Sequence, residues 1–305
     1  MNYFKIYEEY LTTIKNYSNN TVVSYLKDLK DLDDFLIREE LAKNVLEAQR
    51  PRLARYYLSY LEEEGYSKKS IARKISSVRT FYNYMLQEKL VETNIFEQIE
   101  IPKIPKRLPK VITENEIGYL FDAIDQTTLL GYRNYLILDL LFSCGLRASE
   151  LINIEIKDIQ ILRKQILIHG KGKKDRFVPI HNKLITEIKH YLTEIRPKLI
   201  SKSEIKTNIL LLNYKGEPLT TKGLQVILNK ILSDANETYH ISPHMIRHTF
   251  ATTMLNHGAD LRVVQELLGH EHLKSTQIYT EVSNQILKQK YDKMHPRMMK
   301  NEKNR

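Results

Sequence analysis

The chain has 305 residues, 42% of them hydrophobic, and a formal net charge of +10 at pH 7. This length is enough for two domains with cores of their own. No apolar run approaches the roughly 20 residues that a membrane-spanning helix needs. The positive charge favours a polyanionic partner such as nucleic acid, although a lysine-rich proteome would produce the same balance.

The N-terminal stretch MNYFKIYEEYL is amphipathic and of mixed charge, without the basic start and apolar centre of a signal peptide. We therefore expect a cytoplasmic protein that does not associate with a membrane. Cys144 is the only cysteine, which excludes an internal disulfide bond. Because Cys144 follows an apolar run, we expect a buried structural thiol and not a nucleophile.

Residues 1–100 have the pattern of a bundle of about four helices. Apolar residues recur at helical spacing in residues 21–40, again in residues 53–61, and a third time from Ser67 to Met85. The basic residues of the third segment are Lys68, Lys69, Arg73, Lys74 and Arg79. Such side chains either face DNA or form an ordinary solvated surface, and the segment alone leaves both interpretations open.

Residues 101–112 are typical of a basic, proline-rich linker. Their three prolines prevent a helix and favour an extended backbone. The basic residues between the prolines have no acidic neighbours and include Lys103, Lys106 and Arg107. We therefore predict two domains, residues 1–100 and 113–305, joined by a semi-rigid basic linker.

The second domain is predicted to be mostly helical, with one small sheet. Thr113 and Glu116 have the spacing of a capping box, and residues 128–145 are apolar enough to predict a buried helix, which a short helix follows. In residues 154–181, Ile and Val alternate with polar residues around GKGKK, which predicts a small antiparallel sheet with a basic hairpin turn. Helices resume from Leu184.

The stretch SPHMIRHTFATTML, residues 242–255, predicts a helix that Ser242 caps and Pro243 opens. His244 and Arg247 are three residues apart, so they share one face of its first turns. A helix start favours anions, because its free N–H groups point outward there. These residues therefore indicate a phosphate or carboxylate site. The apolar face is expected to hold Met245, Ile246, Phe250, Met254 and Leu255.

A zinc site at His244 and His248 is a weaker interpretation of the same helix. HMIRH lacks the glutamate of an H-E-x-x-H motif, and an arginine among zinc ligands would repel the cation. We assign His248 to structure, since it lies on a different face from His244.

Four other residues stand where structure alone does not require them. Arg147 begins a helix after Gly145, and Lys171 lies between two glycines of the hairpin turn. His270 ends the stretch QELLGH, a helix that Gly269 is expected to close, and Tyr279 follows nine residues later. Taken singly, each has an ordinary explanation: an ion pair, a solvated lysine, a helix cap, and one of 19 tyrosines.

Together, these segments resemble the tyrosine recombinases of the phage integrase family, specifically the Xer-type enzymes that resolve bacterial chromosomes. The resemblance rests on GLRASEL, HGKGKKDR, HMIRHTFAT, LGHEHLKSTQIY and YDKMHPR. NNTVVSYLKDLKDLDDFL and KKSIARKISSVRTFYNYM resemble the N-terminal DNA-clamping domain of the family. The resemblance implies a mostly α fold, with a SAM-like, core-binding helical bundle and a mainly α catalytic domain that contains a small antiparallel β-sheet.

The resemblance also implies how the phosphate is bound and attacked. A DNA phosphodiester gains negative charge as a nucleophile attacks it, and arginines can stabilise that charge. Arg147 and Arg247 are the implied clamps of the non-bridging oxygens, and His270 is an implied hydrogen-bond partner of the phosphate. Tyr279 is the implied nucleophile, which forms a 3′-phosphotyrosyl bond.

The implied proton carriers are His244, as the base for Tyr279, and Lys171, which protonates the leaving 5′-oxygen. Glu150, three residues after Arg147, is implied to hold the basic residues in place. The phosphotyrosyl ester retains the energy of the broken bond, so we expect no metal and no cofactor. The sequence contains no G-x-x-x-x-G-K-[ST] loop, in agreement with this expectation.

The implied partner is double-stranded DNA at a specific site, gripped by both domains. The residues predicted to contact it are Lys68, Lys69, Arg73, Lys74, Arg79, Lys103, Lys106, Arg107, Lys173, Lys174 and Arg176. Four protomers, all of this chain or shared with a sister recombinase, would exchange strands through a Holliday junction. The C-terminal helix near residues 286–294 would dock on a neighbouring protomer, and a septal DNA translocase is a further implied partner.

The biological role most favoured is the resolution of chromosome dimers at cell division. Two alternatives stay open at this stage. One is an integrase or transposase of a mobile element, which uses the same chemistry. The other is a DNA-binding protein that occupies its site without cutting.

Overall fold

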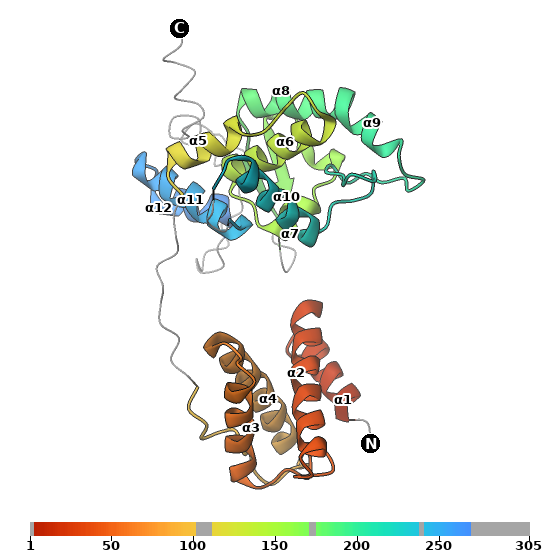
Figure 1. The fold of residues 1–305 in the computed structure, drawn as a ribbon, viewed down its shortest axis with the longest axis vertical. Helices are drawn as coiled ribbons and strands as arrows, with labels where there is room; N and C mark the ends of the chain where they lie inside the picture. The colour runs from red at the N-terminus through yellow and green to blue at the C-terminus, as the bar shows by residue number, and fades with distance from the viewer. Residues whose placement is uncertain (1–2, 102–111, 171–174, 238–240, 270–305) are drawn as a thin grey trace. The chain divides into compact units, whose positions relative to one another are not determined.

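The computed structural model describes residues 3–101, 112–170, 175–237 and 241–269 (Figure 1). The chain divides into two compact units, Met1–Arg107 and Leu108–Arg305. The division falls inside the predicted linker, of which residues 102–111, with Lys103, Lys106 and Arg107, lie outside the described residues. None of the described helices has the length and hydrophobicity required to cross a lipid bilayer.

The N-terminal unit is helical throughout its regular elements, as predicted. Its elements are α1 (Tyr3–Glu9), the π-helical turn η1 (Tyr10–Ile14), α2 (Asn19–Arg38), α3 (Pro51–Glu63) and α4 (Lys68–Gln87). Serine side chains cap the two longest helices: Ser18 accepts the N–H of Thr21, and Ser67 accepts the N–H of Ser70. Each cap satisfies one of the donors that a helix start leaves free.

Aromatic rings fill the core of this unit. Tyr10 and Tyr84 stack with 3.8 Å between ring centroids, and Tyr7 packs against the edge of Phe81 at 5.1 Å. The buried hydroxyl of Tyr82 donates to the carbonyl of Val45 at 2.6 Å. Burial raises the pKa of Tyr7 and Tyr82. These phenols therefore stay neutral and serve packing.

Lys74 of α4 is not available to DNA, which corrects one predicted contact. Only 3% of Lys74 is exposed, and its ammonium forms ion pairs with Asp28, at 3.5 Å, and with Asp31 of α2. Lys74 lies three residues after the buried Ile71, on the face of α4 that packs inward. Arg73 also pairs with Asp28 but keeps 47% of its side chain exposed.

Arg79 also binds within its own unit. Its guanidinium donates to the carbonyls of Phe96 at 3.0 Å and Ile99 at 2.6 Å, and so fixes the segment after α4. Lys68 and Lys69 are exposed at the start of the same helix. Of the basic residues predicted on α4, the ones left to form an exposed surface are therefore Lys68, Lys69 and Arg73.

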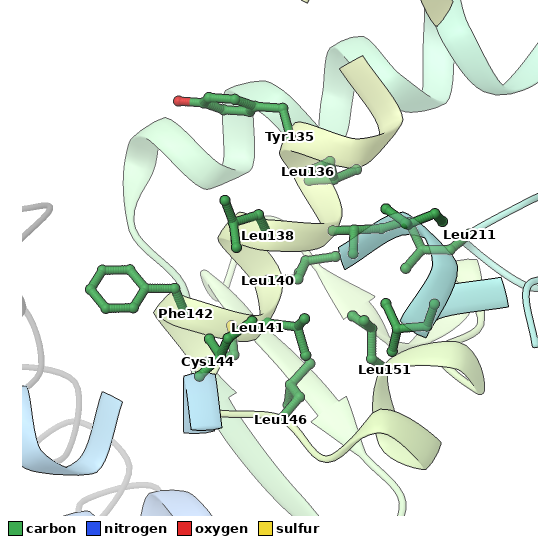
Figure 2. Packing of buried hydrophobic residues seen from close by; sticks show 14 of the residues in the cluster. Tyr135, Leu136, Leu138, Leu140, Leu141, Phe142, Cys144, Leu146, Leu151 and Leu211 are labelled. Atoms are coloured by element: carbon green, nitrogen blue, oxygen red, sulfur yellow. The ribbon is translucent and has the colours of Figure 1, made fainter. Parts of the chain in front are cut away.

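Helix α6 (Leu129–Cys144) is the centre of the C-terminal unit. Every residue from Arg133 to Cys144 is buried. Figure 2 shows how several hydrophobic side chains of this helix, among them Leu138, Leu141 and Cys144, lie in the core. Burial raises the pKa of the Cys144 thiol, as expected for a structural cysteine. The other described α-helices of the unit are α5 (Glu114–Asp122), α7 (Ala148–Ile152), α8 (Asn182–His190), α9 (Arg196–Ile200), α10 (Thr221–Asp234), α11 (Pro243–Asn256) and α12 (Leu261–Leu268).

The helix caps predicted for the C-terminal unit are present, and the apolar face predicted for α11 is present except at Leu255. Thr113 and Glu116 form a capping box at the start of α5, and Ser242 caps α11 by accepting the N–H of Met245. On α11, Ile246, Phe250 and Met254 are buried, whereas Leu255 is 39% exposed and does not belong to the apolar face. A π-helical turn, η3 (Tyr191–Ile195), joins α8 to α9.

The predicted sheet is confirmed and has three short antiparallel strands. They are β1 (Ile159–Gln160), β2 (Gln165–Ile168) and β3 (Arg176–Pro179), in the order β1-β2-β3, after a 3-10 turn, η2 (Ile156–Asp158). Ile166 pairs with Ile159 on one side and with Val178 on the other. The turn residues Lys171, Lys173 and Lys174 lie outside the described residues.

Gly145 makes the turn from α6 to α7. Its φ is +59°, in the left-handed region that favours glycine. A Cβ at this position would lie 2.5 Å from Cδ1 of Phe250 on α11. The close approach of α11 to the end of α6 therefore requires glycine. Two residues later, Arg147 is the N-cap residue of α7.

Gly145→Ala should destabilise the C-terminal unit by about 2 kcal/mol or more, because alanine is strained at positive φ and its methyl group would displace Phe250. Denaturant unfolding measures the change. Gly118→Ala is the matched control: Gly118 lies inside α5, and a methyl group there would have no other atom within 4 Å, so this change should stabilise by up to about 1 kcal/mol. Equal effects of the two substitutions would contradict this account of Gly145.

Candidate active site

Three arginines from different elements converge on one carboxylate in the C-terminal unit. Arg147 precedes α7, Arg176 begins β3, and Arg247 lies in the second turn of α11. All three have a guanidinium nitrogen within 4.0 Å of the carboxylate of Glu150. Glu150, which the resemblance implies holds the basic residues in place, lies within this distance of Arg147 and Arg247, and Arg176 is a further partner.

Glu150 has nearly all of its acceptor capacity occupied. It lies at the third position of α7, where its Oε2 accepts the N–H of Arg147 at 2.8 Å and its Oε1 accepts Nη1 of Arg147 at 2.6 Å. Arg176 donates to both oxygens, from Nη1 to Oε1 and from Nη2 to Oε2, at 2.9 Å each. Nη1 of Arg247 lies 3.7 Å from Oε2. This carboxylate therefore fixes the direction of the Arg147 and Arg176 guanidinium groups and forms a longer ion pair with Arg247.

The charge on Glu150 is secure at neutral pH. Its side chain is only 5% exposed, and burial acts to raise its pKa. The hydrogen bonds and charge of Arg176, together with those of Arg147, outweigh burial and hold the pKa at about 2.

Arg247 is the most enclosed of the three arginines, with 8% of its side chain exposed. Nη1 donates to the carbonyl of Gly145 at 2.7 Å, and Nη2 donates to the carbonyl of Leu268. Burial lowers the pKa of Arg247 to about 10, with the charge of Arg147 acting in the same direction and Glu150 opposing both effects. Arg247 is therefore still a cation at neutral pH.

The C-terminal end of α12 supplies the remaining acceptors. Its last carbonyls have no partner within the helix, and they carry the negative end of the helix dipole. Arg176 Nε donates to Leu267 at 2.8 Å, and Arg147 Nη2 donates to Gly269 at 3.4 Å, beside the bond from Arg247 to Leu268. The arginine cluster is thereby fastened to the end of the helix that precedes His270.

The cluster keeps an excess of positive charge. Three guanidinium groups and one carboxylate give a net charge of +2. Arg147 has 37% of its side chain exposed, and His244 is exposed on the first turn of α11. Exposed N–H donors beside a buried, fixed positive charge are suited to a phosphate anion.

Several predicted site residues are not placed by these contacts. Lys171, His270 and Tyr279 lie outside the described residues, as do Lys173 and Lys174. Among the described residues, no group of three or more His, Cys, Asp or Glu side chains is arranged to hold a metal ion.

Arg176 corrects the sequence prediction that it contacts DNA. Its side chain is only 11% exposed, and its guanidinium is bound to Glu150 and to the carbonyl of Leu267. Its position in the sequence could have indicated this role: Arg176 begins strand β3, with the sequence RFVP, and is not part of the basic GKGKK turn.

The comparisons with known proteins cover almost the entire chain. Residues 110–285 match the Phage integrase family, and residues 4–89 match the Phage integrase, N-terminal SAM-like domain. Tyrosine recombinase XerC of Bacillus subtilis (strain 168) is 40% identical over 299 residues, which is 98% of each chain. Tyrosine recombinase XerC of Oceanobacillus iheyensis is 43% identical over 295 residues, 97% of this chain and 96% of the relative.

Solved structures share the fold at lower sequence identity. The integrase of the transposon Tn1549, in complex with a circular intermediate DNA, has a TM-score of 0.70 at 19% identity and covers 94% of this chain and 98% of its own. A lambda integrase dimer bound to a COC′ core site has a TM-score of 0.65 at 16% identity, with 92% and 98% coverage.

Glu150 should make the stability of the C-terminal unit depend on pH on the acid side. Its folded pKa of about 2 lies below the ordinary value of 4.5, so the unfolded chain binds this proton first as the pH falls. The stabilisation is complete above about pH 4.5 and is lost toward pH 2. Glu150→Gln should lower the free energy of unfolding by about 3 kcal/mol at pH 7, and its difference from wild type should shrink toward about pH 2.5.

Denaturant unfolding at a series of pH values tests this expectation. Asp234→Asn is the control, because Asp234 forms an exposed ion pair with Lys230 and should contribute little at any pH. A difference between wild type and Glu150→Gln that stays constant across this whole pH range would contradict the assignment of the low pKa.

Proposed function

The chain belongs to the phage integrase family, and on this premise we propose that Arg147 and Arg247 bind the phosphate at which it cuts DNA. It is a site-specific tyrosine recombinase that cuts and rejoins DNA, like the relatives to which it is similar over nearly its whole length. The observation that supports the phosphate role is the net positive arginine cluster around the buried carboxylate of Glu150.

The cluster suits the charge that develops during the reaction. As an oxygen attacks phosphorus, negative charge accumulates on the non-bridging oxygens of the phosphate. Arg147 offers a half-exposed planar fork, and Arg247 supplies a buried charge close behind it. Because Glu150 and the carbonyls of α12 already hold both side chains, little reorganisation is needed when DNA binds.

Tyr279 is the proposed nucleophile. Its hydroxyl oxygen attacks the phosphorus, a 3′-phosphotyrosyl bond forms, and the bond from phosphorus to the 5′-oxygen breaks. His244 takes the phenol proton, Lys171 gives a proton to the leaving 5′-oxygen, and His270 hydrogen-bonds a phosphate oxygen. The reverse reaction with a different 5′-hydroxyl rejoins the strand without ATP.

Double-stranded DNA is the partner, and basic residues outside the cluster are proposed to bind its backbone. On α4 the exposed residues Lys68, Lys69 and Arg73 serve this role. From the linker and the hairpin we propose Lys103, Lys106, Arg107, Lys173 and Lys174. Such contacts release counterions, so affinity should fall steeply with salt.

The assembled complex is proposed to be a tetramer on two DNA sites. Its protomers are copies of this chain, or this chain together with a sister recombinase, and they exchange strands in pairs through a Holliday junction. The segment near residues 286–294, which lies outside the described residues, is proposed to dock on the next protomer, and a septal DNA translocase is a further proposed partner.

The resolution of chromosome dimers in the cytoplasm at cell division is the proposed biological role. The near full-length identity of 40–43% to the XerC relatives supports this role over mobile-element integration, since the transposon integrase shares only the fold at 19% identity.

Covalent trapping should identify the nucleophile. We expect wild type, incubated in EDTA with a library of nicked duplexes of random sequence, to form a protein–DNA adduct that survives denaturing electrophoresis. Tyr279→Phe should form none, because it lacks the attacking oxygen. Tyr119→Phe, at a tyrosine that is 62% exposed in the same unit, should react like wild type. An adduct that persists in Tyr279→Phe would exclude Tyr279 as the nucleophile.

Loss of the gene should leave unseparated chromosomes at the division site in a fraction of cells. Abolishing homologous recombination should suppress this defect, because dimers arise by crossing over between sister circles. Microscopy of stained DNA measures the fraction, and wild type but not Tyr279→Phe should restore separation. Normal separation together with a lost ability to excise a resident mobile element would favour the integrase role instead.

A further inference from the structure

We propose that Arg176 is a positioning residue of the active site: it sets Glu150, and through Glu150 the two phosphate-binding arginines, and it anchors the end of α12. This inference rests on the proposed function of Arg147 and Arg247. It assigns to Arg176 a role that is different from contact with DNA.

The bidentate bond from Arg176 fixes the plane of the Glu150 carboxylate. Its Nη1 and Nη2 each hold one oxygen at 2.9 Å, in the parallel geometry that gives guanidinium–carboxylate pairs their directionality. With that plane fixed, Oε1 faces Nη1 of Arg147, and Oε2 faces Nη1 of Arg247. Arg147 also contacts both oxygens, through its backbone N–H and Nη1, and Arg176 adds a second pair of bonds that holds the carboxylate from the side of β3.

Arg176 also holds the end of α12. Its Nε donates to the carbonyl of Leu267 at 2.8 Å. A Cβ on Gly269, which has a φ of +66°, would lie 3.2 Å from Cδ of Arg176. The side chain of Arg176 therefore lies against the backbone where α12 ends, and it ties β3, α7 and α12 together at one point.

The exposure of the arginines separates their roles. Arg176 uses three of its five N–H donors on acceptors of this chain, and 11% of its side chain is exposed. Arg147 has 37% of its side chain exposed. Arg147 also binds Glu150 and the carbonyl of Gly269, but its greater exposure leaves part of its guanidinium open to an anion, whereas Arg176 is enclosed by its partners.

Arg196 provides the matched control for a merely structural arginine. It is 9% exposed, and its guanidinium donates to the carbonyls of Thr207 and Ile209. Like Arg176, it lies in the C-terminal unit and satisfies backbone acceptors, but these acceptors are carbonyls away from the candidate site. Loss of either fork removes hydrogen bonds, and only loss of the Arg176 fork should disturb the chemistry.

The experiment compares Arg176→Met, Arg176→Lys and Arg196→Met in the full chain. The probe is a nicked duplex of the sequence that wild type captures best. Duplex affinity over a salt series and the single-turnover rate of adduct formation at saturating DNA are measured at a temperature below the melting temperature of every variant. The thermal midpoint of each variant is measured separately.

For Arg176→Met we expect adduct formation to slow about 100-fold, with affinity and its salt dependence within about twofold of wild type. Arg176→Lys keeps the charge but cannot hold both oxygens and the Leu267 carbonyl, so it should melt close to wild type and still react about 10-fold more slowly. Arg196→Met should lower the thermal midpoint and leave the rate within about twofold. Adding Arg176→Met to the Glu150→Gln variant should slow the reaction by a further factor of less than about three, because both substitutions remove the same contact between Arg176 and Glu150.

Four results would overturn the inference. A salt slope reduced by about one, with an unchanged rate at saturating DNA, would make Arg176 a DNA contact. A wild-type rate in Arg176→Lys would mean that only the charge of Arg176 matters. Equal slowing in Arg176→Met and Arg196→Met would mean that Arg176 contributes only to stability. If wild type itself forms no adduct on any duplex, the proposed function fails, and this inference fails with it.

Discussion

The buried carboxylate of Glu150 is the constraint on which the rest of the site depends. Three guanidinium groups repel one another, and in a poorly solvated place that repulsion is strong. One carboxylate at their centre, with the carbonyl end of α12 as a second negative pole, allows them to be held together. The positive charge that remains is fixed in place before an anion arrives, which is how electrostatic stabilisation of a transition state avoids reorganisation.

The elements around the site explain why the carboxylate can sit there. Helix α6 is buried on all sides and gives the unit a rigid centre. Its left-handed end at Gly145 turns the chain at once into α7, where Glu150 caps the first turn by accepting the N–H of Arg147. Helix α11 packs on that turn through Phe250 and so delivers Arg247 beside it. The site is built on the ends of helices, where free backbone groups supply the missing partners.

The N-terminal unit shows that a count of basic residues does not give the surface that DNA meets. Lys74 and Arg79 are basic and lie on the same helix as Lys68 and Lys69, yet they bind acidic side chains or carbonyls inside the unit. Removing either charge from its partners would leave buried polar groups unsatisfied. The net charge of +10 therefore predicts the class of partner and not the individual contacts.

The sequence by itself determined the family, the mostly α class, the antiparallel sheet and the caps at Thr113 and Ser242, because these depend on ordered motifs, periodicity and neighbours a few residues apart. Only the tertiary structure decided the roles of Lys74 and Arg176. Lys74 meets Asp31 across 43 residues of chain, and Arg176 meets Glu150 across 26. The spacing of neighbouring residues in the sequence cannot identify partners that lie so far apart along the chain. Whether a cation ends in solvent or in a buried ion pair is fixed by which helix and strand pack together.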